Sequence, residues 1–268
     1  MPDADDRKKF DRDSVANTLT VAVTLSLVCS VLVASAAVLL KPLQVRNEEN
    51  FRQAIILDVA GIGAAGVDED SPLERIEARM VDLERGEFTA DVPVDGYDAL
   101  AAARDSVLGV EVPAELDIAG VRRRARMLPV YVVRDGDAIS QVILPVYGAG
   151  LWSTMRGYLA VDADGRTVRG LRFYEHAETP GLGDQIDRPA WRAQWSGKLL
   201  TDDDGRQRIE VIRGTVDADD PDAIYQVDGL AGATLTGRGV ANLLRYWTGP
   251  HGFGPFLESL REGRLNDA

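Results

Sequence analysis

The stretch Asp228-Gly229-Leu230-Ala231-Gly232-Ala233-Thr234-Leu235-Thr236 is followed at once by a segment with the pattern of a helix. Four of the five residues from Gly229 to Ala233 are Gly or Ala, so side chains crowd this backbone very little. Its N–H groups can therefore turn onto an anion, and a helix starting just after Thr234 directs its free amides and dipole to the same point. The stretch predicts a phosphate site that contains a hydroxyl able to bond to the phosphate. The alternative is an ordinary small-residue turn capped by Thr236.

A second motif lies about fifty residues upstream, at His176-Ala177-Glu178-Thr179-Pro180-Gly181-Leu182-Gly183. Its composition is that of a loop, in which Pro180 restricts φ and the two glycines allow the backbone to approach a flat ring closely. In such a loop Leu182 is expected to cover one face of the ring, while Thr179 and backbone groups bond to its polar edge.

Taken together, the two motifs resemble those of the FMN-carrying C subunit of the sodium-pumping NADH:quinone reductases (Nqr), an extracytoplasmic flavoprotein on one membrane anchor. The resemblance implies that Thr234, which closes the Gly-Ala-Thr triplet, carries FMN covalently through a phosphoester bond, one per chain. It also implies that a separate flavin transferase makes this bond from FAD. One departure is Ala231, where the family usually has Ser or Thr. The other segments that carry the resemblance are Lys41-Pro42-Leu43-Gln44, Asn47, Gln53–Leu57, Leu151–Met155, Trp195–Lys198 and Gly252–Leu257.

The resemblance assigns Glu178, Thr179, Leu182 and Trp152 to flavin contact and makes Asp228 part of the motif on which the transferase acts. Other readings remain open: Trp152 as a core aromatic residue, and Asp228 as a turn residue. Lys198 is expected either to attract the phosphate or the reduced flavin, or to be solvated. The expected cofactor-binding residues are Thr234, Trp152, Glu178, Thr179, Leu182, Lys198, Asp228, Gly232, Ala233, Leu235 and Thr236.

Thr236 competes with Thr234, because it also lies at the start of the expected helix. It is more naturally an N-cap, whose oxygen accepts from a free amide two or three residues on. Spacing alone leaves both residues open as the attachment site, and only the family motif selects Thr234. His176 is expected to be a loop histidine with satisfied hydrogen bonds and no redox role.

Several other cofactors are excluded by the residues that the chain lacks. It has no Cys-x-x-Cys for a conventional iron–sulfur site and no Cys-x-x-Cys-His for haem. Its two histidines cannot form a three-His zinc site. No Gly-x-Gly-x-x-Gly follows a strand and no Walker lysine loop is present. We find no general acid–base pair, so no catalytic or metal residue is predicted.

A membrane anchor is predicted from Thr18 to Leu40, 23 residues without a charged side chain. As a helix this segment is about 34 Å long, enough for a hydrocarbon core of about 30 Å. A signal peptide cleaved after Ala36 is the alternative, but the apolar run is longer than a typical h-region. Slightly more Lys and Arg precede the span than follow it, which favours a cytoplasmic N-terminus. The expected location is the bacterial inner membrane, single-pass in contact with lipid, with a periplasmic C-terminal domain.

The expected fold class is α+β, one twisted and largely antiparallel sheet flanked by helices. Its core is expected to begin near Leu128, with four strand-like runs and hairpin turns at Asp135-Gly136 and Asp164-Gly165. Further elements are expected as helices at 48–59, 72–82, 97–103, 188–195 and 237–247 and a strand at 208–212. The expected organisation is a cytoplasmic tail at 1–14, an anchor at 15–41, a membrane-proximal helical or irregular region at 42–127 and an FMN-binding domain at 128–268.

Net charge is −13, which argues against a nucleic-acid partner. The basic run Arg122–Arg126 is the local exception, and a solvated loop or an acidic partner surface explains it better than DNA. The resemblance implies an electron-relay subunit that works with the other subunits of the membrane complex. An analogous alternative is the FMN-carrying G subunit of an Rnf-type ferredoxin:NAD oxidoreductase. A membrane-anchored flavin-binding regulator is a third possibility.

Overall fold

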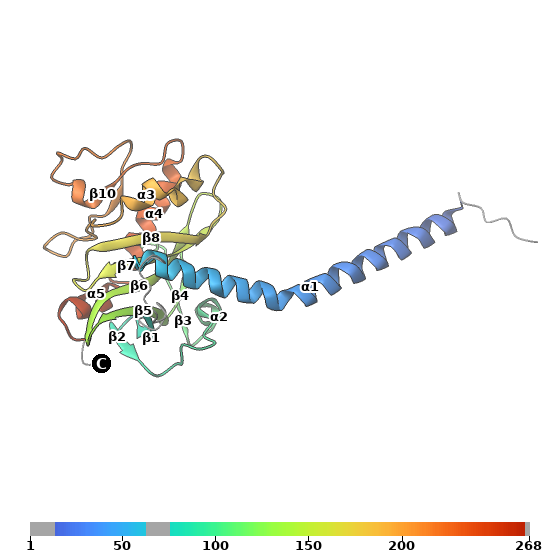
Figure 1. Ribbon diagram of the computed structural model, residues 1–268, viewed down its shortest axis with the longest axis horizontal. Helices are drawn as coiled ribbons and strands as arrows, with labels where there is room; N and C mark the ends of the chain where they lie inside the picture. Colours follow the sequence, from blue (N-terminus) through green and yellow to red (C-terminus); the bar gives the residue numbers. More distant parts are fainter. Residues whose placement is uncertain (1–13, 63–75, 266–268) are drawn as a thin grey trace, which may run out of the picture. The chain divides into compact units, whose positions relative to one another are not determined.

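The computed structural model describes residues 14–62 and 76–265, so the predicted tail at 1–14 falls almost entirely outside the described residues. The chain divides into two compact units, Met1–Phe51 and Arg52–Ala268. Figure 1 shows the elements of both units, labelled in chain order.

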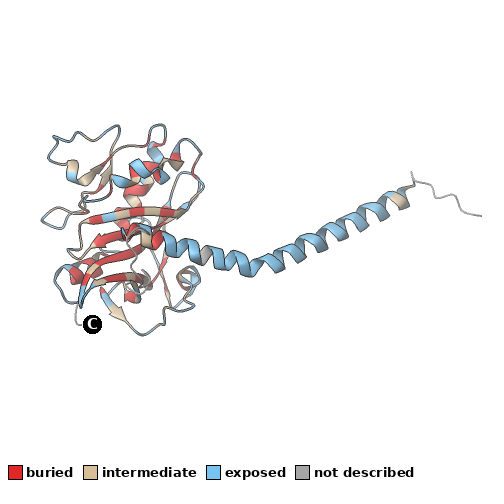
Figure 2. Ribbon diagram, viewed as in Figure 1, coloured by how far each residue is buried: buried red, intermediate tan, exposed pale blue. Residues whose placement is uncertain are grey.

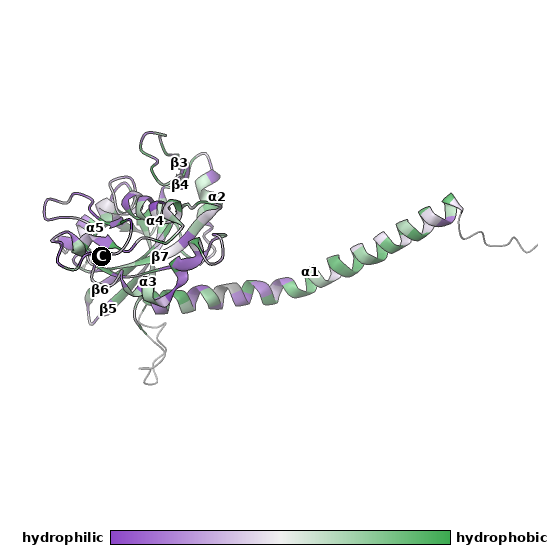
Figure 3. Cartoon of the chain, turned by 90° about the horizontal axis from the view of Figure 1, so that it is seen from above, coloured by the Kyte–Doolittle hydropathy of each residue, from purple (hydrophilic) through white to green (hydrophobic). Residues whose placement is uncertain are grey.

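Helix α1 runs from Val15 to Val59 without interruption. The expected separate helix at 48–59 is therefore wrong as a separate element. Pro42 lies inside α1, where it removes one N–H donor, and the residues from Leu43 to Val59 contain no Gly or Pro that would end a helix. By length and composition, α1 is the one helix of the described residues suited to crossing a membrane. Figure 3 shows its hydrophobic residues gathered in the N-terminal part of the helix.

The second unit is built on one six-stranded sheet in the order β2-β1-β5-β6-β7-β8, in which all neighbouring strands are antiparallel. The predicted class of helices around an antiparallel sheet is confirmed. Both predicted hairpin turns join consecutive strands of this sheet. The strands are β1 (Ile76–Asp82), β2 (Glu87–Thr89), β5 (Met127–Asp135), β6 (Ala138–Ala149), β7 (Thr154–Asp162) and β8 (Val168–Glu175).

Two expectations about the N-terminal side of the sheet were wrong. The segment 76–82, expected as part of a helix, is strand β1, and residues 72–75 lie outside the described residues. β1 pairs with β5 along its whole length, so pairing across the sheet outweighs the local helical pattern. The core sheet therefore begins before Leu128. The extent of an FMN-binding domain at 128–268 stays a prediction.

The two faces of the sheet pack against different helices, because side chains alternate along each strand. In β6, Val142 and Leu144 belong to the larger core, which helix α4 (Thr234–Trp247) covers. Ile143 belongs to a second core with Ile55 and Val59 from the end of α1. Figure 2 shows the strands largely buried between these layers.

The basic run is not a solvated loop. Arg123–Ala125 forms strand β4, which pairs with β3 (Gly109–Glu111), and Arg124 is buried. Arg123 and Arg126 donate to backbone carbonyls of the neighbouring segment. The predicted helices at 97–103 and 188–195 are confirmed in shorter form, as is the strand at 208–212. The remaining elements are α2 (Ala99–Arg104), η2 (Gly183–Asp187), α3 (Pro189–Ala193), β9 (Glu210–Val211), η3 (Ala223–Tyr225), β10 (Gln226–Val227) and α5 (Gly254–Arg261).

Candidate functional site

The small-residue motif forms a turn that leads directly into α4. Gly232 has a φ of +74°, a value that favours glycine. Ala233 is the N-cap and Thr234 the first helical residue. The expectation that Thr236 caps this helix was wrong: Ala233 caps it without a side-chain hydrogen bond. The first turn holds no acidic side chain, so its amides are open to an external anion.

The two threonines of the motif have opposite environments. Thr236 is completely buried, and its hydroxyl donates to Oε2 of Glu178. Thr234 is exposed and lines a surface cavity. A hydroxyl must be accessible to be esterified by another protein, so the structure distinguishes two residues that their spacing left equivalent.

Glu178 is buried, with 4% of its surface exposed, and both carboxylate oxygens are engaged inside the protein. Oε2 accepts from Thr236, and Oε1 accepts from the backbone amides of Leu151 and Trp152, at 2.9 and 3.2 Å. The carboxylate of Glu178 is thus held by groups of the protein itself, and flavin contact by Glu178 stays a prediction. Its position joins three segments: the loop after β6, the loop after β8 and the start of α4.

This joint requires glycine at 183. A Cβ there would lie 2.8 Å from the Cβ of Glu178 and 2.9 Å from the hydroxyl oxygen of Thr236. Because the loop with Leu182 approaches the start of α4 this closely, only glycine fits at position 183. Gln185 adds a second link, because its amide donates to the carbonyls of Leu182 and Ala231, at 2.6 and 3.0 Å. The structure thus brings the two sequence motifs together.

Three large apolar side chains are exposed on the segments that meet here. Trp152 is 70% exposed, Leu235 53% and Leu182 44%. The alternative that Trp152 is a core residue was wrong. A Cβ on Gly232 would lie 2.9 Å from Cδ2 of Leu182, which places Leu182 directly against the motif. Exposed apolar groups beside an accessible hydroxyl fit a flat, largely apolar ring.

Asp228 anchors the motif. Its backbone N–H donates to Oε1 of Gln194 at 2.9 Å, and its Oδ2 accepts from the amide of the same glutamine at 3.0 Å. Its Oδ1 accepts from the backbone of Val216, and its carbonyl accepts from the indole of Trp191, at 2.8 and 2.9 Å. Each oxygen of Asp228 therefore holds a neighbouring segment in place.

Two expected residues have partners of their own. The ammonium of Lys198 donates to the carbonyl of Ala223 at 2.7 Å, and Lys198 does not line the cavity beside Thr234. Burial lowers the pKa of Lys198, and the nearby Asp228 raises it in part. His176 pairs with Asp187 at 2.8 Å, as expected for a loop histidine with satisfied hydrogen bonds.

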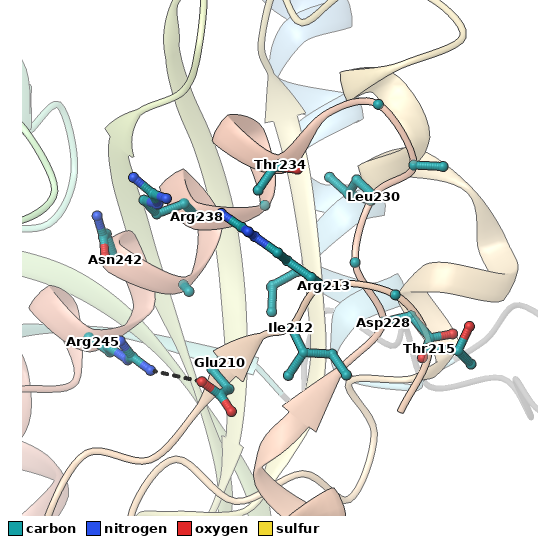
Figure 4. Close-up of a pocket in the computed structure, with 17 residues that line it drawn as sticks. Glu210, Ile212, Arg213, Thr215, Asp228, Leu230, Thr234, Arg238, Asn242 and Arg245 are labelled. Atoms are coloured by element: carbon teal, nitrogen blue, oxygen red, sulfur yellow. Dashed lines mark ion pairs between the residues drawn. The ribbon is translucent and has the colours of Figure 1, made fainter. Parts of the chain in front are cut away.

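The cavity beside Thr234 has a volume of about 540 Å³ and follows one face of α4 (Figure 4). It contains three arginines, Arg213, Arg238 and Arg245, with Glu210 and Asp228 as its acidic residues. None of these arginines was predicted from the sequence. Arg238 could have been predicted, because residues four apart share a helix face, but Arg213 comes from another segment. The lining residues are Glu210–Thr215, Asp228–Gly232, Thr234, Gly237, Arg238, Ala241, Asn242 and Arg245.

The part of the chain that contains the cavity and both motifs also matches a known protein family. The family model described as "FMN-binding domain" matches residues 150–249, which include the loop after β6, both motifs and all of α4. Over 97% of its length the chain is 47% identical to the C subunit of the Na(+)-translocating NADH-quinone reductase of Yersinia pestis, covering 98% of that protein. The protein of the same name from Pseudomonas aeruginosa is 47% identical over 94% of this chain and 98% of its own length.

This chain belongs to the NqrC family, the C subunits of the Na(+)-translocating NADH-quinone reductases. Its structure is similar to the crystal structure of Shewanella oneidensis NqrC, with a TM-score of 0.72 and 33% identity over 81% of this chain and 99% of that one. Of the two families with similar motifs, the chain therefore belongs to the quinone reductase subunits and not to the Rnf-type subunits.

Proposed function

We propose that this chain is the electron-relay subunit of a membrane Na+-translocating NADH:quinone reductase, with FMN covalently bound to Thr234. The match to the FMN-binding domain family and the name that its relatives carry support the flavin and the complex. Electrons enter the flavin from one neighbouring redox centre and leave to another. NADH oxidation, quinone reduction and the sodium path belong, in this proposal, to the other subunits.

The observation that carries the attachment is the contrast between Thr234 and Thr236. Thr234 presents an accessible hydroxyl on the cavity at the start of a helix, whereas the hydroxyl of Thr236 is used inside the protein. In the attachment step, a flavin transferase brings FAD to this hydroxyl. Oγ of Thr234 bonds to the phosphorus on the flavin side, the bond from that phosphorus to the bridging oxygen breaks, AMP leaves, and the hydroxyl proton passes to the surrounding base or water.

The surrounding residues hold the group in place. Trp152, Leu182 and Leu235 provide apolar surface for the ring, and Thr179 supplies polar groups at its edge. FMN provides the one-electron and two-electron redox chemistry when bound, and the protein tunes its potential through nearby charge and hydrogen bonds. A phosphoester retains the cofactor permanently, which suits a carrier that works outside the cytoplasm, where a lost flavin is not replaced.

The anchor gives the chain its place in the cell. Helix α1 holds the protein in the lipid of the bacterial inner membrane, and the second unit works on the periplasmic side, next to the other subunits of the complex. The slight excess of positive charge before the span supports this orientation.

The mass of the full-length chain tests the attachment. Protein made with a flavin transferase is expected to stay yellow after denaturation and to gain the mass of one FMN less one water. The modified peptide is expected to contain Thr234. Thr234→Ala is expected to be colourless after the same treatment, because the acceptor oxygen is missing.

Two matched controls lose a different hydroxyl. Thr215→Ala removes one from an exposed threonine that lines the same cavity, and Thr236→Val removes the buried one at nearly constant volume. Both are expected to keep covalent flavin. A Thr234→Ala chain that retains flavin through denaturation would show that Thr234 is not the attachment residue.

A further inference from the structure

The cavity beside Thr234 concentrates positive charge in a protein that is otherwise acidic. The chain has 43 Asp and Glu against 30 Lys and Arg, yet three arginines line this one cavity. The charge that remains open to a ligand depends on how the arginines and the two acidic residues are paired.

The acidic residues are largely engaged elsewhere. Both carboxylate oxygens of Asp228 accept hydrogen bonds, from Val216 and Gln194. Glu210 accepts from Gln226 and pairs with Arg245 at 3.8 Å. Among the residues described here, the guanidinium groups of Arg213 and Arg238 have neither a hydrogen bond nor an ion pair, whereas most arginines of the second unit pair with a carboxylate. Two guanidinium groups therefore face the cavity uncompensated.

The backbone fixes Arg213 beside the motif. The amide of Ile212 donates to the carbonyl of Val227 at 3.0 Å, and that of Gly229 donates to the carbonyl of Gly214 at 2.8 Å. Arg213 lies between these two bonds. A Cβ on Gly229 would lie 2.4 Å from the carbonyl oxygen of Ile212, so only glycine allows the two segments to approach this closely.

Arg238 lines the same cavity from helix α4. It follows Thr234 by four residues on α4, which puts it about 40° around the helix and about 6 Å along it. In Figure 4, the side chain of Arg213 extends below Thr234 towards α4, and Arg238 lies on α4 to the left of Thr234; both residues line the cavity. Arg245 lies further along α4, next to Glu210.

We propose that Arg213 and Arg238 form a phosphate subsite that holds the phosphate group bonded to Thr234. This inference rests on the attachment proposed above. Guanidinium groups bind phosphate through charge-assisted hydrogen bonds, and the open amides at the start of α4 face the same group. The phosphate has two sources, the diphosphate of the FAD donor before transfer and the phosphoester afterwards. Both present the same anionic oxygens to the two arginines.

The test uses the full-length chain in detergent, made with and without a flavin transferase. The variants are Arg213→Gln with Arg238→Gln, the same pair changed to Lys, and Arg104→Gln. Arg104 is an exposed arginine on α2 that does not line the cavity, so it controls for lost charge. Two quantities are measured: the rate of covalent attachment at limiting FAD, and the gain in Tm on loading, at low salt and in 1 M salt.

For the wild type we expect a gain in Tm that shrinks in 1 M salt, because the contact is ionic. For the Gln pair we expect covalent attachment to be about tenfold slower, or most of the gain in Tm to be lost. The Lys pair and Arg104→Gln are expected to stay near the wild type in both quantities. If the Gln pair attaches flavin slowly but gains as much Tm as the wild type on loading, the arginines bind the FAD donor. If it attaches flavin at the normal rate but gains less Tm, they bind the phosphoester. Normal attachment with an equal gain in the Gln pair overturns the subsite and leaves the attachment intact.

If the wild type takes up no covalent flavin, the attachment fails and inorganic pyrophosphate decides the subsite. Pyrophosphate that raises the Tm of the flavin-free wild type, but not that of the Gln pair, supports the subsite. An equal response in both proteins, or none in either, overturns it.

Discussion

The hydroxyl of Thr236 donates to the carboxylate of Glu178 inside the second unit, although 58 residues separate them in the chain. Both side chains are buried. This bond joins the start of α4 to the loop that carries Leu182, and the other oxygen of Glu178 holds the loop with Trp152. One carboxylate thus fixes the three segments around the proposed flavin site.

The pair predicts a measurable coupling. Thr236→Val leaves a buried carboxylate oxygen without a donor, and Glu178→Gln loses one acceptor; each is expected to lower the free energy of unfolding by about 1–3 kcal/mol. The double variant is expected to lose less than the sum of the two, by about 1 kcal/mol or more. Denaturant unfolding of the full-length chain in detergent measures all three. Thr215→Val, at an exposed threonine, is expected to change stability by less than about 0.5 kcal/mol, and strictly additive losses would contradict the coupling.

The exposed Leu182 predicts a change in the environment of the flavin. In the loaded protein, Leu182→Ala is expected to expose the ring to water and to shift its absorbance and redox potential. The flavin is not expected to be released, because its attachment is at another residue. Spectroscopy and redox titration measure the effect, with Leu100→Ala, an exposed leucine on α2, as the control. Unchanged spectra and potential in both Leu182→Ala and Thr179→Ala would remove this loop from the site.

The hairpin turn at Asp164 predicts a pH-dependent contribution to stability. Burial raises the pKa of Asp164, but hydrogen bonds from Thr167 and from the amide of Arg166 lower it more, to a net value below the ordinary 3.8. Because the folded pKa is depressed, the contribution is fully present above about pH 3.8 and is lost as pH falls through the lower folded pKa. Asp164→Asn is expected to destabilise the protein at pH 7 by about 1 kcal/mol, and by progressively less below pH 4.

Thermal unfolding between pH 3 and pH 7 measures that difference. Asp95→Asn, at an exposed aspartate, serves as the control and is expected to show no such trend. A difference between wild type and Asp164→Asn that grows as the pH falls would contradict the stated sign.

Helix α1 predicts the topology. A reporter that is active only outside the cytoplasm is expected to work when fused to the C-terminus, and a cytoplasmic reporter is expected to be inactive there. The mass of the purified chain is expected to include the residues before Ala36. A chain that starts at Ala37 would instead show a cleaved signal peptide.

Local patterns in the sequence predicted most of the individual elements. The hairpin turns, the strands from 127 to 175 and the helix that follows the Asp228–Thr236 motif were predicted from alternation and turn residues, which depend on near neighbours in the chain. The segment 76–82 was one exception, since its strand forms by pairing with residues about fifty positions later. The continuation of α1 across Pro42 was missed because one lost donor does not end a helix that is otherwise made of helix-forming residues.

The sequence by itself predicted an anion site from small residues, threonines and the start of a helix within nine consecutive positions. Only the tertiary structure decided which threonine is accessible, because that depends on Glu178 reaching Thr236 from another loop. It also decided that Glu178 joins three segments around the proposed site, and that Arg213 and Arg238 share a cavity with Thr234. Burial and charge pairing are set by segments distant in the chain, which no local pattern records.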